Sequence, residues 1–309
     1  MDDVTVVGAG VIGLTCAVRL LEAGARVRVV TADEPLRTVS RLAAAVWYPT
    51  HTAADPRVLV WAHRTYDVLM AQAGDGIAGV APRPTRMLLR RPAGTPWWAA
   101  AVPGFATHPG EWRFTVPSVE MEAYLPWLAE RVRALGGTIM LGRVEHLADL
   151  GGQAGTVVNA TGLGARTLAD DAAMFPARGQ IVVVANPGIE TSVRDEEHPD
   201  GMTYIHPRSR DVVLGGTFQP GDWNEAPEPA TSAAILRRCA ELVPELAGVR
   251  PLWEAAGLRP AREGGPRLEV DPQRLPGGTR VVHCYGHGGA GVTLSWGCAD
   301  EVTGLVARS

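Results

Sequence analysis

The chain has 309 residues and a formal net charge of −4 at pH 7. Its 46% hydrophobic and 20% charged residues are ordinary for a globular protein that buries a large core. The small negative charge offers no basic surface to nucleic acid or an anionic membrane, and no apolar run is long enough to span a bilayer. Because the start Met1-Asp2-Asp3 lacks the basic segment of a signal peptide, we expect a cytoplasmic protein.

The four cysteines do not form a metal-binding pattern. Cys16, Cys239, Cys284 and Cys298 show neither a C-x-x-C spacing nor a close zinc-like spacing with histidine. We therefore expect no metal site, and free thiols suit a reducing compartment. A homodimer is the expectation from the general frequency of two-fold oligomers.

A dinucleotide-binding motif opens the chain. Strand-like residues 4–7 lead into Gly-Ala-Gly-Val-Ile-Gly at 8–13, and a helical pattern follows at once. In this context Gly8 permits the tight turn, Gly10 lets the backbone approach a pyrophosphate, and Gly13 lets helix and strand pack closely. The N-terminus of the helix then offers free N–H groups to the phosphates.

A second apolar strand, residues 27–30, continues this unit, and Asp33 follows it. The carboxylate of Asp33 stands about where an acidic residue reaches a ribose hydroxyl. This order of elements predicts a bound dinucleotide: a strand, a glycine turn, a helix, a second strand and an acidic residue. The motif alone leaves FAD and NAD open.

Further along, the pattern predicts three helices, at residues 117–135, 231–246 and 294–306. Strands are expected at residues 138–141, 180–185 and 211–216, and residues 156–162 are expected to form a short strand that runs into a glycine turn. The segment 81–109 is rich in Pro, Gly and Trp and shows no regular pattern. A second glycine-rich turn, 286–291, lies near the C-terminus with no βαβ unit after it, so it must complete a cofactor domain begun earlier.

The expected fold class is therefore α/β, with a Rossmann-like FAD-binding domain assembled from separate segments. That domain comprises residues 1–50, 138–178 and 255–309. An inserted α+β substrate domain with an antiparallel sheet comprises residues 51–137 and 179–254. An elongated cofactor such as FAD needs contacts from several loops, and this arrangement supplies them.

The chain resembles the D-amino-acid oxidases along nearly its whole length. Besides the opening motif, the matching stretches are residues 43–49, 158–162, 178–180, 204–207, 214–219, 257–262 and 285–293. The resemblance implies FAD as cofactor and oxidative deamination of D-amino acids to 2-oxo acids and ammonia. Hydride would pass from the substrate Cα to flavin N5, and molecular oxygen would reoxidise the flavin to give hydrogen peroxide.

The resemblance also implies which residues hold the substrate. Arg259, in Gly-Leu-Arg-Pro, matches the arginine that binds the substrate carboxylate, and a guanidinium fork suits that task. Tyr204 would hydrogen-bond the same carboxylate, while Tyr48 and Gly289 would line the substrate pocket. Arg262 is expected to be structural. No side chain is assigned as acid or base, because the cofactor carries the chemistry.

The expected FAD-binding residues fall in four stretches of mostly small residues, together with the acid after the second strand. They are Gly8, Ala9, Gly10, Val11, Ile12, Gly13, Asp33, Ala43, Ala44, Ala45, Val46, Thr161, Gly162, Gly288, Gly289, Ala290, Gly291, Val292 and Thr293. His206 and His287 are interpreted as structural histidines.

Two departures from the family bear on specificity. Phe218 stands where D-aspartate oxidases carry an arginine for a second carboxylate, which favours neutral D-amino acids. The stretch 197–202 lacks the lid tyrosine of eukaryotic members, which predicts a shortened lid. The alternatives are an oxidase of glycine or N-methyl amino acids, a D-aspartate oxidase, an NAD-dependent dehydrogenase and a non-catalytic flavin-binding protein.

Overall fold

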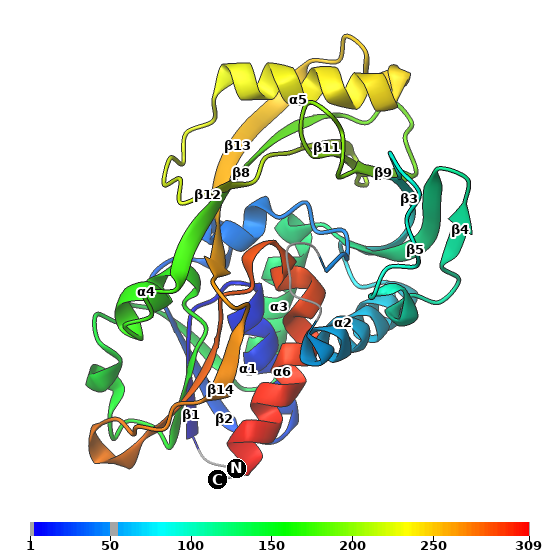
Figure 1. Cartoon of the computed structure of the whole chain (residues 1–309). Coiled ribbons are helices and arrows are strands. Elements are labelled where there is room, and N and C mark those ends of the chain that lie inside the picture. The colour runs from blue at the N-terminus through cyan, green and yellow to red at the C-terminus, as the bar shows by residue number, and fades with distance from the viewer. Residues whose placement is uncertain (1–2, 50–54, 309) are drawn as a thin grey trace.

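The computed structural model describes residues 3–49 and 55–308 and contains two sheets, one above the other in Figure 1. The lower sheet has six strands in the order β14-β15-β7-β1-β2-β6, all parallel except β14. Its strands are β1 (Asp3–Val7), β2 (Arg26–Thr31), β6 (Thr138–Leu141), β7 (Thr156–Asn159), β14 (Arg267–Val270) and β15 (Arg280–Tyr285).

Four helices accompany this sheet: α1 (Val11–Glu22), α2 (Pro56–Gly74), α3 (Met121–Ala134) and α6 (Gly291–Ala307). Helix α1 packs against α3 and α6, and α2 packs against α6 (Figure 1). The buried face of α1 carries Leu14, Ala17 and Val18, at the spacing of one helix face. Parallel strands β1 and β2 with α1 between them thus form the βαβ unit that the opening motif predicts.

The upper sheet has nine strands. Eight follow the order β12-β8-β11-β10-β9-β3-β5-β4, and the ninth, β13, pairs with β8. The strands are β3 (Val80–Leu88), β4 (Ala106–His108), β5 (Glu111–Val119), β8 (Met174–Ala185), β9 (Ser192–Asp195), β10 (Thr203–Pro207), β11 (Asp211–Gly215), β12 (Gln219–Pro220) and β13 (Pro251–Arg262). Helix α5 (Pro229–Leu242) covers this sheet, burying Ile235 and Cys239 (Figure 1).

Short helical turns complete the described chain. They are α4 (Ala165–Leu168) and the 3₁₀ helices η1 (Pro35–Arg37), η2 (Val39–Leu42), η3 (Ala99–Ala101), η4 (Leu147–Leu150), η5 (Gly162–Gly164), η6 (Pro244–Leu246), η7 (Pro276–Gly278) and η8 (Gly288–Ala290). No helix within residues 3–49 and 55–308 combines the length and apolar character needed to cross a bilayer.

The expected fold class is confirmed: parallel and antiparallel sheets combine with helices in an α/β architecture. Several element boundaries were wrong; the strand expected at residues 180–185, for example, begins at Met174. The helix expected from residue 117 begins at Met121, because residues 117–119 pair with β3 as the end of β5. Helix α5 ends at Leu242, two residues before Pro244, and α6 begins at Gly291, earlier than expected.

The segment 81–109, in which no regular structure was expected, contains most of β3. Pro82 and Pro84 lie inside this strand and pair in register with Pro117 and Thr115 of β5. Prolines remove ladder donors and are unusual inside a sheet, so the pattern concealed a strand that tertiary pairing imposes.

The two sheets do not follow the expected domain boundaries everywhere. Strand β8 begins at Met174 and lies wholly in the nine-stranded sheet, together with all of β13. Helix α3, expected in the substrate domain, contacts α1 and β6 of the six-stranded unit. The expected boundary at residues 50–51 lies outside the described residues.

Candidate active site

A cavity of about 770 Å³ lies where the two sheets meet. Its walls include the ends of β1 and β2, the start of α1 and parts of β8, β10 and β13. Seventeen of the nineteen expected FAD-binding residues line it, and so do all four expected substrate residues, Arg259, Tyr204, Tyr48 and Gly289. The exceptions are Gly13 and Ala290.

The glycines at the start of α1 have distinct geometric reasons. Gly8 has φ of +109°, and a Cβ there would overlap the carbonyl of Ala160. Gly13 faces the protein interior, where a Cβ would overlap the Gly8 carbonyl, so it serves helix–strand packing and does not reach the cavity. A Cβ on Gly10 would lie 3.0 Å from Ser40 Oγ, at the cavity wall.

Ser40 is a cavity residue that the sequence analysis missed. Its Oγ accepts a hydrogen bond of 3.0 Å from the backbone N–H of Val11, in the first turn of α1. Ser40, in η2, therefore caps this helix from another segment, since the N-cap residue Gly10 has no side chain to do so. The sequence feature that could have indicated Ser40 is the pair of hydroxyl residues, Thr38 and Ser40, just before residues 43–49, the alanine-rich loop.

Two segments far apart in the sequence are tied together beside the cavity. Thr293 Oγ1 accepts a hydrogen bond from Tyr48 N at 3.1 Å and donates one to Tyr48 O at 3.0 Å. The alanine-rich loop and the start of α6 are therefore held in one arrangement. Ala290, in the turn before α6, is fully buried and faces away from the cavity.

Arg259 projects from β13 into space left by a glycine. Its Nη1 donates to the Thr217 carbonyl at 3.0 Å. Gly179 on β8 pairs in register with Gly257, and a Cβ on Gly179 would overlap the Arg259 guanidinium. The missing side chain therefore determines where the guanidinium lies.

The residues on either side of Gly179 face the opposite way, as strand alternation requires. Arg178 is fully buried, and its guanidinium donates to the carbonyls of Asn224 and Ala226, both at 2.7 Å. Gln180 donates to Ser232 Oγ at 2.7 Å. The Arg-Gly-Gln stretch thus anchors the chain beyond β12 on one face and leaves room for Arg259 on the other.

Tyr204 lies on β10 with 6% of its surface exposed. A Cβ on Gly215 of the neighbouring strand would overlap its ring. Burial raises the pKa of the Tyr204 phenol, while the positive charges of Arg259 and Arg194 and a hydrogen bond with Arg259 oppose the rise. The side chain is thus a neutral phenol held beside the Arg259 guanidinium.

Arg194 is a buried arginine that lines the cavity, and the sequence analysis missed it too. It lies opposite Tyr204 in the β9–β10 pairing, and its Cζ is 4.1 Å from the centre of the Tyr48 ring. Nη2 donates to Glu196 Oε1 at 3.0 Å. Nε is buried and has no hydrogen-bond partner among the described residues. Phe218, by contrast, does not line the cavity.

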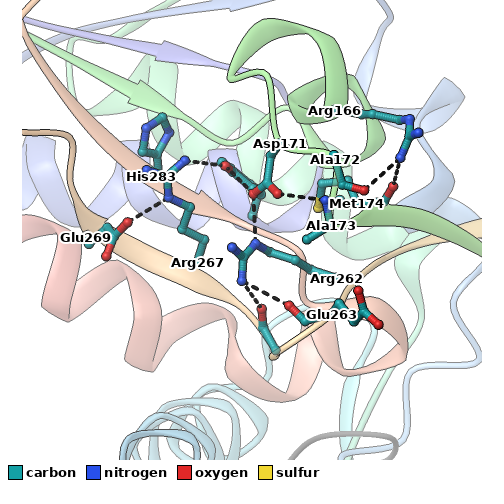
Figure 2. A network of polar contacts seen from close by, with 12 residues as sticks. Arg166, Asp171, Ala172, Ala173, Met174, Arg262, Glu263, Arg267, Glu269 and His283 are labelled. Atoms are coloured by element: carbon teal, nitrogen blue, oxygen red, sulfur yellow. Dashed lines mark hydrogen bonds and ion pairs between the residues drawn. The ribbon is translucent and has the colours of Figure 1, made fainter. Parts of the chain in front are cut away.

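Arg262 belongs to a separate network, which supports its expected structural role. Its Nε donates to Asp171 Oδ2 at 2.8 Å, and Figure 2 shows its guanidinium pointing toward Asp171 and the nearby backbone carbonyls. The Tyr285 hydroxyl also donates to Asp171. These partners hold the pKa of the Asp171 carboxyl below its usual value, against the opposing effect of burial.

The chain between β9 and β10, residues 196–202, is short and fixed to α5. His198 lies 3.3 Å from Glu241, and Arg238 donates to the carbonyl of Asp200 at 3.1 Å. Within residues 196–202, Met202 alone lines the cavity. This agrees with the expectation of a shortened lid.

His287 is buried at the cavity floor, and desolvation lowers its pKa to about 4, so it is neutral at physiological pH. Its Nε2 has no hydrogen-bond partner among the described residues. One ring nitrogen lies within 4.8 Å of the thiols of Cys284 and Cys298. The sequence spacing did not reveal this cluster, because α6 and β15 bring the residues together only in the fold.

Residues 3–305 match the DAO family, described as FAD dependent oxidoreductases. The chain belongs to this family. It is 51% identical to the D-amino-acid oxidase of Rubrobacter xylanophilus, over 98% of this chain and 95% of the relative. It is 42% identical to the D-amino-acid oxidase of Streptomyces coelicolor, over 99% and 97%. Identity to human D-aspartate oxidase is 38%, over 99% and 94%.

Solved structures show the same fold. Glycine oxidase from Geobacillus kaustophilus superposes with a TM-score of 0.82 at 21% identity, covering 100% of this chain and 95% of that one. FAD is thus the cofactor, and the NAD-dependent alternative is wrong. The cavity fits FAD. Gly8 and Gly10 line it at the N-terminus of α1, where the backbone N–H groups could bind the pyrophosphate.

Replacing Ser40 tests the helix-capping contact at the cofactor end of the cavity. Ser40→Ala removes the acceptor of the Val11 N–H, and lost caps cost about 1 kcal/mol. We expect FAD affinity to fall by about fivefold, measured by titrating apoprotein with FAD. Ser40→Thr keeps the hydroxyl and should bind FAD like the wild type. Unchanged affinity in Ser40→Ala would show that the contact does not shape the cofactor site.

Proposed function

We propose that this protein oxidatively deaminates D-amino acids, using FAD and oxygen, to 2-oxo acids, ammonia and hydrogen peroxide. The observation that carries the proposal is the pairing of Arg259 with the buried Tyr204 in the cavity that the expected cofactor residues line. A guanidinium beside a neutral phenol is suited to a carboxylate. The two bacterial relatives named D-amino-acid oxidase support the same substrate class.

In the proposed mechanism the protein binds and orients, and it supplies no acid or base. Arg259 forms the ion pair with the substrate carboxylate, and Tyr204 donates its phenolic hydrogen to the same group. FAD, when bound, supplies the hydride acceptor. Burial of Tyr48 and Tyr204 keeps both phenols neutral, because it raises the pKa of each. Positioning of this kind supplies much of the rate in reactions between oriented groups.

The structures named glycine oxidase share 20–21% identity with this chain, so they show the fold alone. An oxidase of glycine or N-methyl amino acids would be recognised by its substrates. Anaerobic addition of D-methionine, L-methionine, glycine and sarcosine to the yellow protein separates the two. Bleaching of the flavin by D-methionine alone is the expected result, and bleaching by glycine or sarcosine alone would refute the proposal.

Arg259→Ala should lose turnover and keep the cofactor. The guanidinium is the cation expected to meet the carboxylate, whereas the expected FAD contacts lie elsewhere in the cavity. We expect kcat/KM for D-methionine to fall by about a hundredfold or more, with an unchanged visible flavin spectrum. Arg259→Lys keeps the charge without the forked guanidinium, so its kcat/KM should lie between those of the wild type and Arg259→Ala. Near-normal turnover in Arg259→Ala would refute the role.

Gly179→Ala should reproduce much of that loss without touching an ionisable group. The added methyl group would occupy the space of the Arg259 guanidinium, the mobile end of a long side chain, so the fold should survive. We expect kcat/KM to fall at least about tenfold. Gly94→Ala is the matched control, because no atom lies within 4 Å of its added Cβ. Wild-type kinetics in Gly179→Ala would show that the guanidinium lies elsewhere.

A second candidate function is oxidation of acidic D-amino acids, and Arg194 favours it. The preference for neutral substrates rested on Phe218, which does not line the cavity, whereas the buried Arg194 does. Its Nη2 is paired with Glu196, but Nε has no partner among the described residues, so this donor remains for a substrate carboxylate. Human D-aspartate oxidase is among the relatives.

Arg194→Met tests this candidate. Methionine keeps the length of the side chain but offers no donor. We expect kcat/KM for D-aspartate to fall at least about tenfold relative to that for D-methionine. The ratio of the two substrates is the readout, because a general loss of stability would lower both. An unchanged ratio would leave neutral D-amino acids as the substrates.

We further propose that the protein acts in the cytoplasm and forms a homodimer. All four cysteines are free and buried, which suits a reducing compartment.

A further inference from the structure

Four polar side chains lie together on two neighbouring strands beside the cavity, and three of them, Arg194, Tyr204 and His206, line it. Tyr204 pairs in register with Arg194, and Ile205 pairs with Val193, so Ser192 and His206 come next along the same strands. Residues two apart share a face of a strand. Ser192, Arg194, Tyr204 and His206 therefore form a two-by-two array, and all four are buried.

His206 connects the other members of this array. Ser192 Oγ lies 3.1 Å from His206 Nδ1, and Arg194 Nη1 lies 3.3 Å from His206 Nε2. A guanidinium has no acceptor, so Nε2 must accept the hydrogen bond from Arg194. Nδ1 then carries the proton and donates to Ser192.

The protonation state of His206 agrees with this arrangement. Its burial and, secondarily, the charge of Arg194 hold the pKa of the ring well below its usual value. The imidazole is therefore neutral and keeps the lone pair that Arg194 needs. The ring also stacks on Tyr204, with centres 4.8 Å apart and planes at 12°.

We propose that His206 is a positioning residue: fixed by Ser192, it aims the Arg194 guanidinium at the side chain of an acidic substrate. The proposal rests on the second candidate function above. A free arginine side chain has many rotamers, and ordering it costs free energy that a fixed partner supplies in advance. His206 and Glu196 hold the two terminal nitrogens, and Tyr48 supports the face of the guanidinium.

The alternative interpretation is that His206 only packs against Tyr204. Two substitutions separate the interpretations. His206→Phe keeps an aromatic ring for stacking and removes both nitrogens. His206→Gln loses the ring but has an amide oxygen that can accept from Arg194 and an amide N–H that can donate to Ser192.

The experiment compares KM and kcat for D-aspartate and D-methionine in both FAD-loaded variants. In His206→Phe we expect KM for D-aspartate to rise at least about tenfold, with kcat and the D-methionine constants changed less than about threefold. His206→Gln should restore most of the D-aspartate affinity. Equal losses for both substrates, or greater damage in His206→Gln than in His206→Phe, would overturn the proposal and support simple packing.

A double substitution tests that His206 acts through Arg194. In the Arg194→Met background, His206→Phe should have no further effect on KM for D-aspartate, because the group that it positions is absent. Additive effects would overturn the proposal.

The outcomes also distinguish this proposal from the proposed function. A wild-type protein that oxidises D-methionine, but neither D-aspartate nor D-glutamate, overturns the role of His206 and leaves D-amino-acid oxidation standing. A protein whose flavin no D-amino acid reduces overturns both.

Discussion

The antiparallel pairing of β8 with β13 fixes the position of the groups on which the cavity depends. It runs in register from Trp253 opposite Val183 to Arg262 opposite Met174. This pairing sets the side chain of Arg259 across the empty position of Gly179. At its far end Ala261 bridges to His287, next to the glycine turn of the cofactor loop. One ladder of backbone hydrogen bonds thus relates the proposed carboxylate site to the cofactor end of the cavity.

The electrostatics of the cavity around Tyr204 follow from burial. The guanidinium groups of Arg259 and Arg194 line this part of the cavity, whereas the phenols Tyr48 and Tyr204 and the imidazole of His206 are kept neutral. Burying an uncompensated charge is costly, and each arginine has acceptors: Thr217 for one, Glu196 for the other. The cavity is therefore pre-organised for anions, and its neutral groups carry no charge that would compete.

Local sequence patterns were enough to predict the elements at the cofactor end of the cavity. The opening motif predicted its strand, turn, helix and second strand because each follows from neighbours in the chain. The resemblance to a family placed Arg259 and Tyr204. Arg194 and Ser40 were not found, because each acquires its importance from a partner in another segment: Tyr204 across the β9–β10 pairing, and the N–H of Val11. Strand β3 was hidden for a similar reason, since its prolines disfavour a strand in the local pattern and the pairing with β5, a distant segment, forms it nevertheless.

The buried thiols have a consequence for observing the protein's motions. Cys16 and Cys298 lie on α1 and α6 beside the six-stranded sheet, and Cys239 lies on α5 against the nine-stranded one; all three are fully buried. Burial raises the pKa of the Cys239 thiol to about 12, so it does not react with alkylating reagents while the structure is closed. Each half of the molecule therefore contains a cysteine whose alkylation reports local opening. The order in which these thiols become alkylated indicates which sheet opens first.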